Sequence, residues 1–279
     1  MGRIQDTADE RDIALDRVGI TGLRYPLRVP SREGDAVADC VVSLHVSLSR
    51  ETRATHMSRF VATLETHRRE VLDARGIERL LTSLRDSLDA EAAFVEIEHT
   101  HYVEKQAPET KATSLLACDV ARSSSLDSDG FDHVLSVRVP VHSVCPCSME
   151  MTGGASHSQR GHVAVALRAQ GRVAVEDIVA VVEASASAPL FPLLRGSDER
   201  RVIESAHDRP VLVEDLARNV AERLDSDVRV LWYSVEARNQ DSVHAHDACA
   251  SVTRRPTDLG QDDGPGDRPR GGTPRSKQP

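Results

Sequence analysis

The segment CVVSLHVSL at residues 40–48 constrains the fold more than any other part of the sequence. Apolar residues occupy every second position, and Ser43, His45 and Ser47 alternate with them. This pattern predicts a strand with one buried face. We expect one strand before it, at residues 18–28. Two helices at residues 53–74 and 77–88 and two strands at residues 93–104 and 111–121 are expected after it. The first half of the chain therefore predicts the element order ββααββ.

The second half of the chain repeats this order after the segment SSSLDSDG, which is expected to be a loop. We expect strands at residues 132–144 and 162–169, helices at residues 175–186 and 210–224, and strands at residues 227–237 and 243–252. Two ββααββ units predict an α+β fold with antiparallel sheets and both helices of each unit on one face. We expect a flexible N-terminus at residues 1–11, tandem units at residues 12–125 and 126–253, and a disordered tail at residues 254–279.

Composition narrows the classes of protein to which the chain can belong. A net charge of −9 gives no sign of binding to nucleic acid or membranes, although a local cluster of basic residues could still hold an anionic substrate. No apolar run is long enough for a membrane span, and we expect a cytoplasmic protein. The five cysteines are then expected to be thiols. The polar face of the sheets favours assembly into an oligomer, for example a closed barrel.

The segment SVCPCSMEMTGGASHSQRGHV at residues 143–163 holds the most informative chemistry. Pro146 predicts extended backbone for Cys145 and Cys147, where a disulfide between them would be strained. We expect one thiolate to act and the other to support it. A Gly-Gly pair lets the chain fold back, so that His157 approaches Cys145 as half of a metal site. The alternative is two partly buried thiols beside a surface histidine.

Further candidates lie late in the chain. His244 and His246 are expected on one face of the last strand, and Asp241 comes just before them. Glu199 and Glu214 lie in the segments SDER and LVED, where carboxylates more often serve a helix dipole or face solvent.

These segments together resemble GTP cyclohydrolase type IB. The resemblance covers residues 12–252 and rests on THMSRF, CPCS-x-x-M with GASHSQR, SDER, VED and SVHAHDA in this order. It implies the tunnelling fold, with two ββααββ units per chain and a homotetramer. It also implies hydrolysis of GTP at C8 to formate and 7,8-dihydroneopterin triphosphate, the first step of tetrahydrofolate and pterin biosynthesis.

The resemblance assigns a metal site to three residues. Cys145, His157 and Glu199 would hold one divalent metal per active site. A sulfur, a nitrogen and an oxygen ligand are compatible with manganese, ferrous iron or zinc. Such a metal can activate water at neutral pH for the attack on GTP.

The resemblance also implies roles in binding and proton transfer. Glu214 would hold the guanine ring, and His244 would transfer protons with His246 close by. Asp241 and Cys147 would assist catalysis. Three basic residues are candidates for binding the triphosphate: Arg160, Arg59 and Lys105. The alternative for Arg59 and Lys105 is a solvated surface residue.

The chain departs from the family pattern at Asp241, where the family usually has glutamate. Two smaller departures are SLLACDV and the GHV that follows the QR pair. The nearest alternative function is that of a sibling enzyme forming 7,8-dihydroneopterin 2′,3′-cyclic phosphate. A nicotinamide-dependent nitrile reductase of the same fold is a further alternative, against which the metal ligands argue. The last alternative is a non-enzymatic metal-binding protein.

Overall fold

Nine strands and six helices follow one another in the computed structural model, which describes residues 11–32 and 34–255. The described chain divides into a smaller unit, residues 11–32, 34–99 and 121–134, and a larger unit, residues 100–120 and 135–255. The expected N-terminal segment and tail lie outside the described residues, except for residues 11, 254 and 255. The two tandem units were predicted from the repeated order of elements along the chain. Their boundaries stay a prediction.

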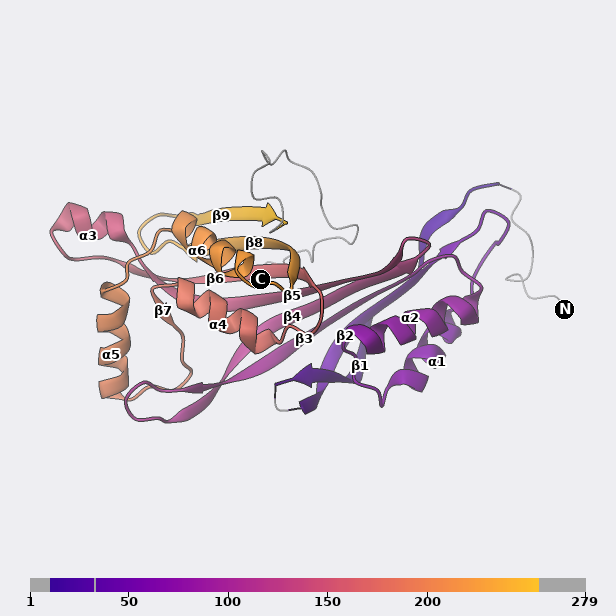
Figure 1. Cartoon of the computed structure of the whole chain (residues 1–279), viewed down its shortest axis with the longest axis horizontal. Helices are drawn as coiled ribbons and strands as arrows, with labels where there is room; N and C mark the ends of the chain where they lie inside the picture. The colour runs from indigo at the N-terminus through magenta and orange to yellow at the C-terminus, as the bar shows by residue number, and fades with distance from the viewer. Residues whose placement is uncertain (1–10, 33, 256–279) are drawn as a thin grey trace. The chain divides into compact units, whose positions relative to one another are not determined.

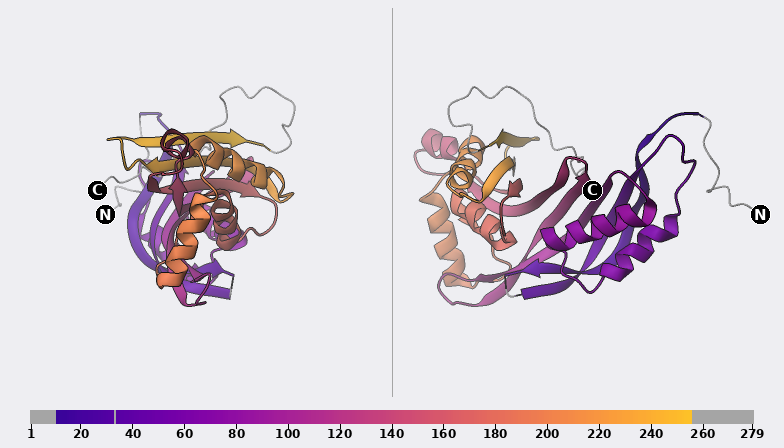
Figure 2. Two further views of the ribbon diagram at one scale, coloured as in Figure 1. Left: turned by 90° about the vertical axis from the view of Figure 1, so that its left-hand side faces the viewer. Right: turned by 45° about the vertical axis from the view of Figure 1, so that its right-hand side comes forward.

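The smaller unit begins with two long strands and two helices, followed by the start of a third strand (Figure 1). Their bounds are β1 (Leu15–Ser31), β2 (Gly34–Leu48), α1 (Met57–His67), α2 (Ala74–Leu88) and β3 (Ala93–Gln106). The strand β2 pairs antiparallel with both β1 and β3. Figure 2 shows α1 and α2 together on one side of these strands.

The core of the smaller unit follows directly from the two periodicities in its sequence. Alternate residues of β2 face inward, and Cys40, Val42, Leu44 and Val46 are at most 1% exposed. Buried helix residues at spacings of three and four cover them: Phe60 and Leu64 of α1, and Ile77, Leu80, Leu81 and Leu84 of α2.

The larger unit carries the remaining elements. Their bounds are β4 (Thr113–Asp127), β5 (Gly130–Val144), α3 (Pro146–Thr152), β6 (Ser158–Ala169), α4 (Val175–Ser185), β7 (Ala188–Pro189), α5 (Gly196–His207), α6 (Val213–Asp225), β8 (Val230–Gln240) and β9 (Asp247–Arg254). The strands β3, β4 and β5 contribute residues to both units. Within the larger unit β6 lies between β5 and β8, and β9 pairs with β8. The short β7 pairs with β5.

The helices α4 and α6 form the core of the larger unit with the sheet. Val175, Ile178, Val179 and Val182 lie on one face of α4, at helical spacing, and are buried. Six residues of α6 share this core with inward residues of β6 and β8: Val213, Leu216, Ala217, Val220, Ala221 and Leu224. None of the helices in the described residues is both long and apolar enough to cross a lipid bilayer.

The predicted α+β architecture is confirmed, and the first six elements have the expected order ββααββ. In the second half α3, β7 and α5 are additional to the expected order. The helix expected at residues 210–224 begins at Val213, so Pro210 lies before it. The last strand begins at Asp247, and His244 and His246 therefore lie in the preceding loop.

The expected loop SSSLDSDG is wrong for most of its length. The strand β4 continues to Asp127, and β5 begins at Gly130, whose φ of 110° suits glycine. Small polar residues can continue a strand when a neighbouring strand satisfies them. Ser124 is 7% exposed, and its Oγ lies 2.7 Å from Nδ1 of His133 on β5. This hydrogen bond satisfies the buried Ser124 hydroxyl, which in a loop would bind water instead.

Candidate active site

Cys145 lies where β5 ends and α3 begins. Its backbone is extended (φ −78°, ψ 114°), as expected before Pro146. Partial burial raises the pKa of the Cys145 thiol, but hydrogen bonds from Ser148 and Cys147 outweigh this and lower it. The site therefore favours a thiolate at Cys145. The expectation of extended backbone at Cys147 is wrong, because Cys147 is an exposed residue in the first turn of α3.

His157 returns to the side of Cys145 after a chain reversal. Gly153 and Gly154 have φ values of 72° and 131°, which allow this reversal. The backbone N–H of Cys145 then donates to the carbonyl oxygen of His157 at 3.3 Å. The Oγ of Ser156 donates to the carbonyl of Cys145 at 2.6 Å. The predicted return of His157 towards Cys145 is confirmed.

The loop at residues 241–246 carries the other two histidines. Asp241 Oδ1 accepts hydrogen bonds from the backbone N–H groups of Val243 and His244, at 2.7 and 2.8 Å. These two bonds lower the pKa of the Asp241 carboxyl well below its usual range. Its Oδ2 lies 3.3 Å from Nδ1 of His244. The rings of His244 and His246 are 5.3 Å apart between centroids, so the two histidines are neighbours.

Ser242 connects this loop to the Cys145–His157 pair. Its Oγ lies 2.9 Å from Nδ1 of His157. If Nδ1–H donates to this hydroxyl, the lone pair of Nε2 is free for a metal. Ser242 was not among the site residues predicted from the sequence. The contact joins positions 85 residues apart, so the segment DSVH alone could not have predicted it.

Glu199 lies in the first turn of α5 and is exposed, next to the fully buried Asp198. Within residues 11–32 and 34–255, no three His, Cys, Asp or Glu side chains gather closely enough to hold a metal ion. The structure thus joins Cys145 to His157 through a backbone hydrogen bond but does not add Glu199 to them. The pair fits a divalent metal in its chemistry, since it offers a thiolate and an imidazole nitrogen.

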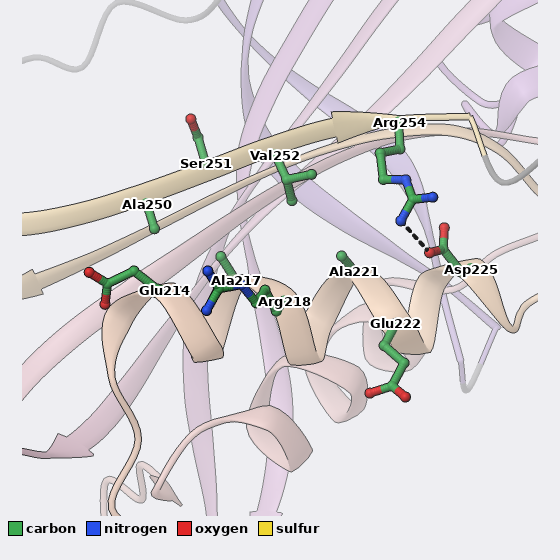
Figure 3. Close-up of a pocket in the computed structure, with 10 residues that line it drawn as sticks. All are labelled: Glu214, Ala217, Arg218, Ala221, Glu222, Asp225, Ala250, Ser251, Val252 and Arg254. Carbon is green, nitrogen blue, oxygen red and sulfur yellow. Dashed lines mark hydrogen bonds and ion pairs between the residues drawn. The ribbon is translucent and has the colours of Figure 1, made fainter. Parts of the chain in front are cut away.

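A groove of about 580 Å³ runs between α6 and β9 (Figure 3). Glu214 lies at its one end, in the first turn of α6, and an ion pair between Asp225 and Arg254, at 3.2 Å, lies at the other. No other described residue forms a hydrogen bond or ion pair with the Glu214 carboxylate. The small side chains of Ala217, Ala221 and Ala250 leave space along the groove: the full lining is these three with Glu214, Arg218, Glu222, Asp225, Ser251, Val252 and Arg254.

The three basic candidates have different surroundings. Arg160 is exposed on β6, directly opposite His142 on β5. Lys105 forms a largely buried ion pair with Glu183 and lies 5.1 Å from the ring centroid of Phe191. Arg59 belongs to the smaller unit and donates to the carbonyl oxygen of Ser87 at 3.0 Å. The phosphate roles of all three stay predictions.

Comparison with solved structures identifies the fold. The chain is similar to the uricase of Arthrobacter globiformis, with a TM-score of 0.54 and 10% identity over 91% of this chain and 96% of that one. It is also similar to urate oxidase from Bacillus sp. TB-90, with a TM-score of 0.53 and 8% identity over 86% of this chain and 100% of that one. At these identities the likeness concerns the fold alone, and it confirms the predicted tunnelling fold.

Comparison of sequences identifies the family. Residues 1–250 match the family described as type I GTP cyclohydrolase folE2. The chain is 40% identical over 254 residues to the GTP cyclohydrolase FolE2 of Nitrosococcus oceani, covering 90% of this chain and 94% of that protein. It is likewise 40% identical over 252 residues to the FolE2 protein of Methylococcus capsulatus, with the same coverage. The chain therefore belongs to the FolE2 family of type I GTP cyclohydrolases.

Proposed function

We propose that this protein is a metal-dependent GTP cyclohydrolase. It hydrolyses GTP at C8, releases formate and forms 7,8-dihydroneopterin triphosphate, the first step of tetrahydrofolate and pterin biosynthesis. The observation that carries the proposal is membership of the FolE2 family over residues 1–250. The pairing of Cys145 with His157, beside a loop that holds His244, agrees with this activity. The nitrile reductase and the non-enzymatic alternatives have no comparable support.

The metal site of this proposal consists of Cys145, His157 and Glu199. Manganese, ferrous iron and zinc all suit this donor set. When bound, such a metal supplies Lewis-acid activation of water. The lowered pKa of Cys145 supports its role as a thiolate donor. The hydrogen bond between Ser242 and Nδ1 of His157 supports binding through Nε2.

Glu214 holds the guanine ring in this proposal. An ionised carboxylate can accept hydrogen bonds from both N1–H and the 2-amino group of guanine. The absence of another partner for this carboxylate among the described residues supports the role. The groove beside it, between α6 and β9, has room for a planar ring.

His244 transfers protons during ring opening and closure. A neutral imidazole whose Nδ1–H donates to a carboxylate presents Nε2 as a base. The carboxylate is that of Asp241, which backbone hydrogen bonds keep ionised. His246 and the exposed thiol of Cys147 assist it.

The triphosphate is assigned to Arg160, Arg59 and Lys105. Arg160 is the first candidate, because no described residue pairs with its guanidinium and a guanidinium matches phosphate oxygens well. Lys105 would have to exchange its partner Glu183 for a phosphate.

Assembly and location complete the proposal. A homotetramer in the cytoplasm agrees with the family resemblance. Among the described strands β9 pairs only with β8, so its other edge is available to a second copy.

Removal of the Ser242 hydroxyl tests the link between the loop and the metal ligand. Ser242→Ala is expected to weaken Mn²⁺ binding about 10-fold, which is typical for loss of an outer hydrogen bond to a metal-binding histidine. The melting temperature should not change, because Ser242 is exposed. Equilibrium dialysis against Mn²⁺ measures the affinity, with Ser226→Ala as the control and Ser242→Thr as the variant that keeps the hydroxyl. Wild-type affinity in Ser242→Ala would remove this role.

A stopped assay tests the proposed function itself. Protein reconstituted with Mn²⁺, Fe²⁺ or Zn²⁺ is expected to release formate from GTP, and a chelator should abolish this release. Fluorescence of the oxidised product and analysis of its phosphates distinguish dihydroneopterin triphosphate from the 2′,3′-cyclic phosphate. If no formate forms with any of the three metals, the proposed activity is rejected.

A further inference from the structure

A buried serine links three segments of the larger unit that each lead to a proposed site residue. Ser143 lies on β5, two residues before Cys145, and is 0% exposed. Its Oγ donates to the carbonyl oxygen of Val211 at 3.1 Å. The same Oγ accepts from Nδ2 of Asn239 on β8 at 3.3 Å, and Asn239 is 1% exposed. One hydroxyl thus joins β5, β8 and the segment before α6 in a buried junction of these three residues.

The bond to Val211 fixes the start of α6 against the end of β5. The backbone N–H of Val211 also donates to the carbonyl oxygen of Val144 at 3.1 Å, so Val211 is bound to β5 through both its N–H and its C=O. Glu214, in the first turn of α6, follows Val211 by three residues. Three residues span at most about 11 Å of chain. The place of the Glu214 carboxylate therefore depends on how Val211 is held.

The bond to Asn239 connects the junction to the loop that carries the two histidines. Asn239 is the second residue before Asp241, whose carboxylate contacts His244. Gly161 on β6 lies directly opposite Asn239. A Cβ at Gly161 would overlap Oδ1 of Asn239 and would lie 2.7 Å from the carbonyl oxygen of Arg238. Glycine at this position therefore leaves the space that the Asn239 amide occupies.

We propose that Ser143 and Asn239 are positioning residues for Glu214, and that they hold its carboxylate where it can bind the edge of the guanine ring. This inference rests on the proposed function, in which Glu214 anchors guanine. Without the Ser143 hydroxyl, the Val211 carbonyl and the Asn239 amide lose their shared partner. Buried polar groups without a partner are costly, so the segment before α6 is expected to shift. A shift of about 1 Å is enough to break a hydrogen bond to guanine.

Ser187 supplies a matched control. It lies between α4 and β7 and is 1% exposed, and its Oγ accepts from the backbone N–H of Val144 at 3.0 Å. This buried bond reaches the same strand as Ser143 but involves neither α6 nor β8. Ser187→Ala and Ser143→Ala should both lower the melting temperature, since each leaves a buried backbone group without its partner.

The experiment compares two GTP analogues that resist hydrolysis at C8, one of them without the 2-amino group. Isothermal titration of the full-length protein in its native assembly gives their two Kd values. The ratio of these values reports on the hydrogen bond between Glu214 and the 2-amino group, and contacts with the triphosphate cancel from it. For the wild type we expect a ratio of about 10- to 100-fold, as is usual for a hydrogen bond to a charged group.

The variants are expected to change this ratio in a graded way. Ser143→Ala should reduce it to about 2-fold or less, because the displaced carboxylate no longer bonds the 2-amino group. Asn239→Ala and Gly161→Ala should give intermediate ratios, since each disturbs the amide but leaves the bond between Ser143 and Val211. Ser187→Ala should stay within about 2-fold of the wild-type ratio, as expected for an independent position.

Two results would overturn the inference: a wild-type ratio in Ser143→Ala, Asn239→Ala and Gly161→Ala, or an equal loss in Ser187→Ala. If Ser143→Ala does not fold, the Asn239 and Gly161 variants decide.

The proposed function fails separately. Equal Kd values for the two analogues in the wild type would reject the guanine-anchoring role of Glu214, and this inference with it. Wild-type protein that discriminates between the analogues but releases no formate from GTP would reject the activity, while the ratio series would still report on Ser143.

Discussion

Cys145→Ala is expected to abolish metal retention and formate release. The variant removes the only sulfur donor of the proposed site and leaves an imidazole and a carboxylate. We expect Mn²⁺ or Zn²⁺ affinity to fall by more than about 100-fold, beyond the range typical of residues outside the ligand shell. Elemental analysis of the desalted protein measures the retained metal, and the formate assay measures activity.

Cys147→Ala is the matched control for this variant. Its thiol is exposed on α3, and it differs from Cys145 by donating a hydrogen bond instead of being the acceptor. Cys147→Ala should therefore keep most of the metal while lowering the rate. Equal metal loss in both variants would contradict the assignment, since the two thiols would then chelate together. Cys249→Ala, on the exposed strand β9, should change neither quantity.

Glu214→Ala is expected to abolish measurable GTP binding and to leave metal content intact. Two hydrogen bonds to a carboxylate are worth roughly 1.5–3 kcal/mol each. Their loss corresponds to at least about a 100-fold increase in the Kd for GTP. Isothermal titration with a GTP analogue that resists hydrolysis at C8 measures binding, and elemental analysis measures the metal.

Glu222→Ala tests whether the effect depends on this one carboxylate. Glu222 lines the same groove two turns further along α6. Its replacement should leave the Kd for the GTP analogue near the wild-type value. Inosine triphosphate lacks the 2-amino group and should bind more weakly than GTP to the wild-type protein. To Glu214→Ala the two nucleotides should bind equally weakly. Loss of metal together with GTP binding in Glu214→Ala would reject the anchoring role.

Periodicity predicted the parts of the fold in which one face of an element is apolar. The strand β2 and the helices α2 and α4 have regular apolar spacing, and each buries its apolar face. The helix α5 could not be predicted in this way. Its sequence GSDERRVIESAH is mostly polar, and only two of its residues are buried. Four hydrogen bonds to the buried Asp198 carboxylate, not an apolar face, attach its first turn.

The candidate site was predictable where local chain geometry brings residues together. The Gly-Gly pair and Pro146 in the sequence predicted the approach of His157 to Cys145. The helical position of Cys147 was missed because α3 has only seven residues and no buried side chain. The bond between Ser242 and His157 joins positions 85 residues apart, and no local pattern in the sequence contains that information.

The structure also gives a physical reason why an aspartate at position 241 is suited to this loop. Its short side chain reaches two backbone N–H groups of the residues that follow it, as aspartate often does in turns. A glutamate carries one more methylene, so its carboxylate would lie further from these N–H groups. Asp241 therefore shapes the loop and contacts His244 with the same carboxylate.

Asp241 and Ser242 are consecutive in the chain, and one contacts the imidazole proposed to transfer protons while the other contacts the imidazole proposed to bind metal. Because neighbouring residues of one loop make both contacts, we expect the two events to be thermodynamically linked. Whatever metal binding does to the proton affinity of His244, protonation of His244 must do in equal measure to metal affinity. If His157 binds a metal as proposed, a substitution in this loop is therefore expected to alter both metal affinity and proton transfer.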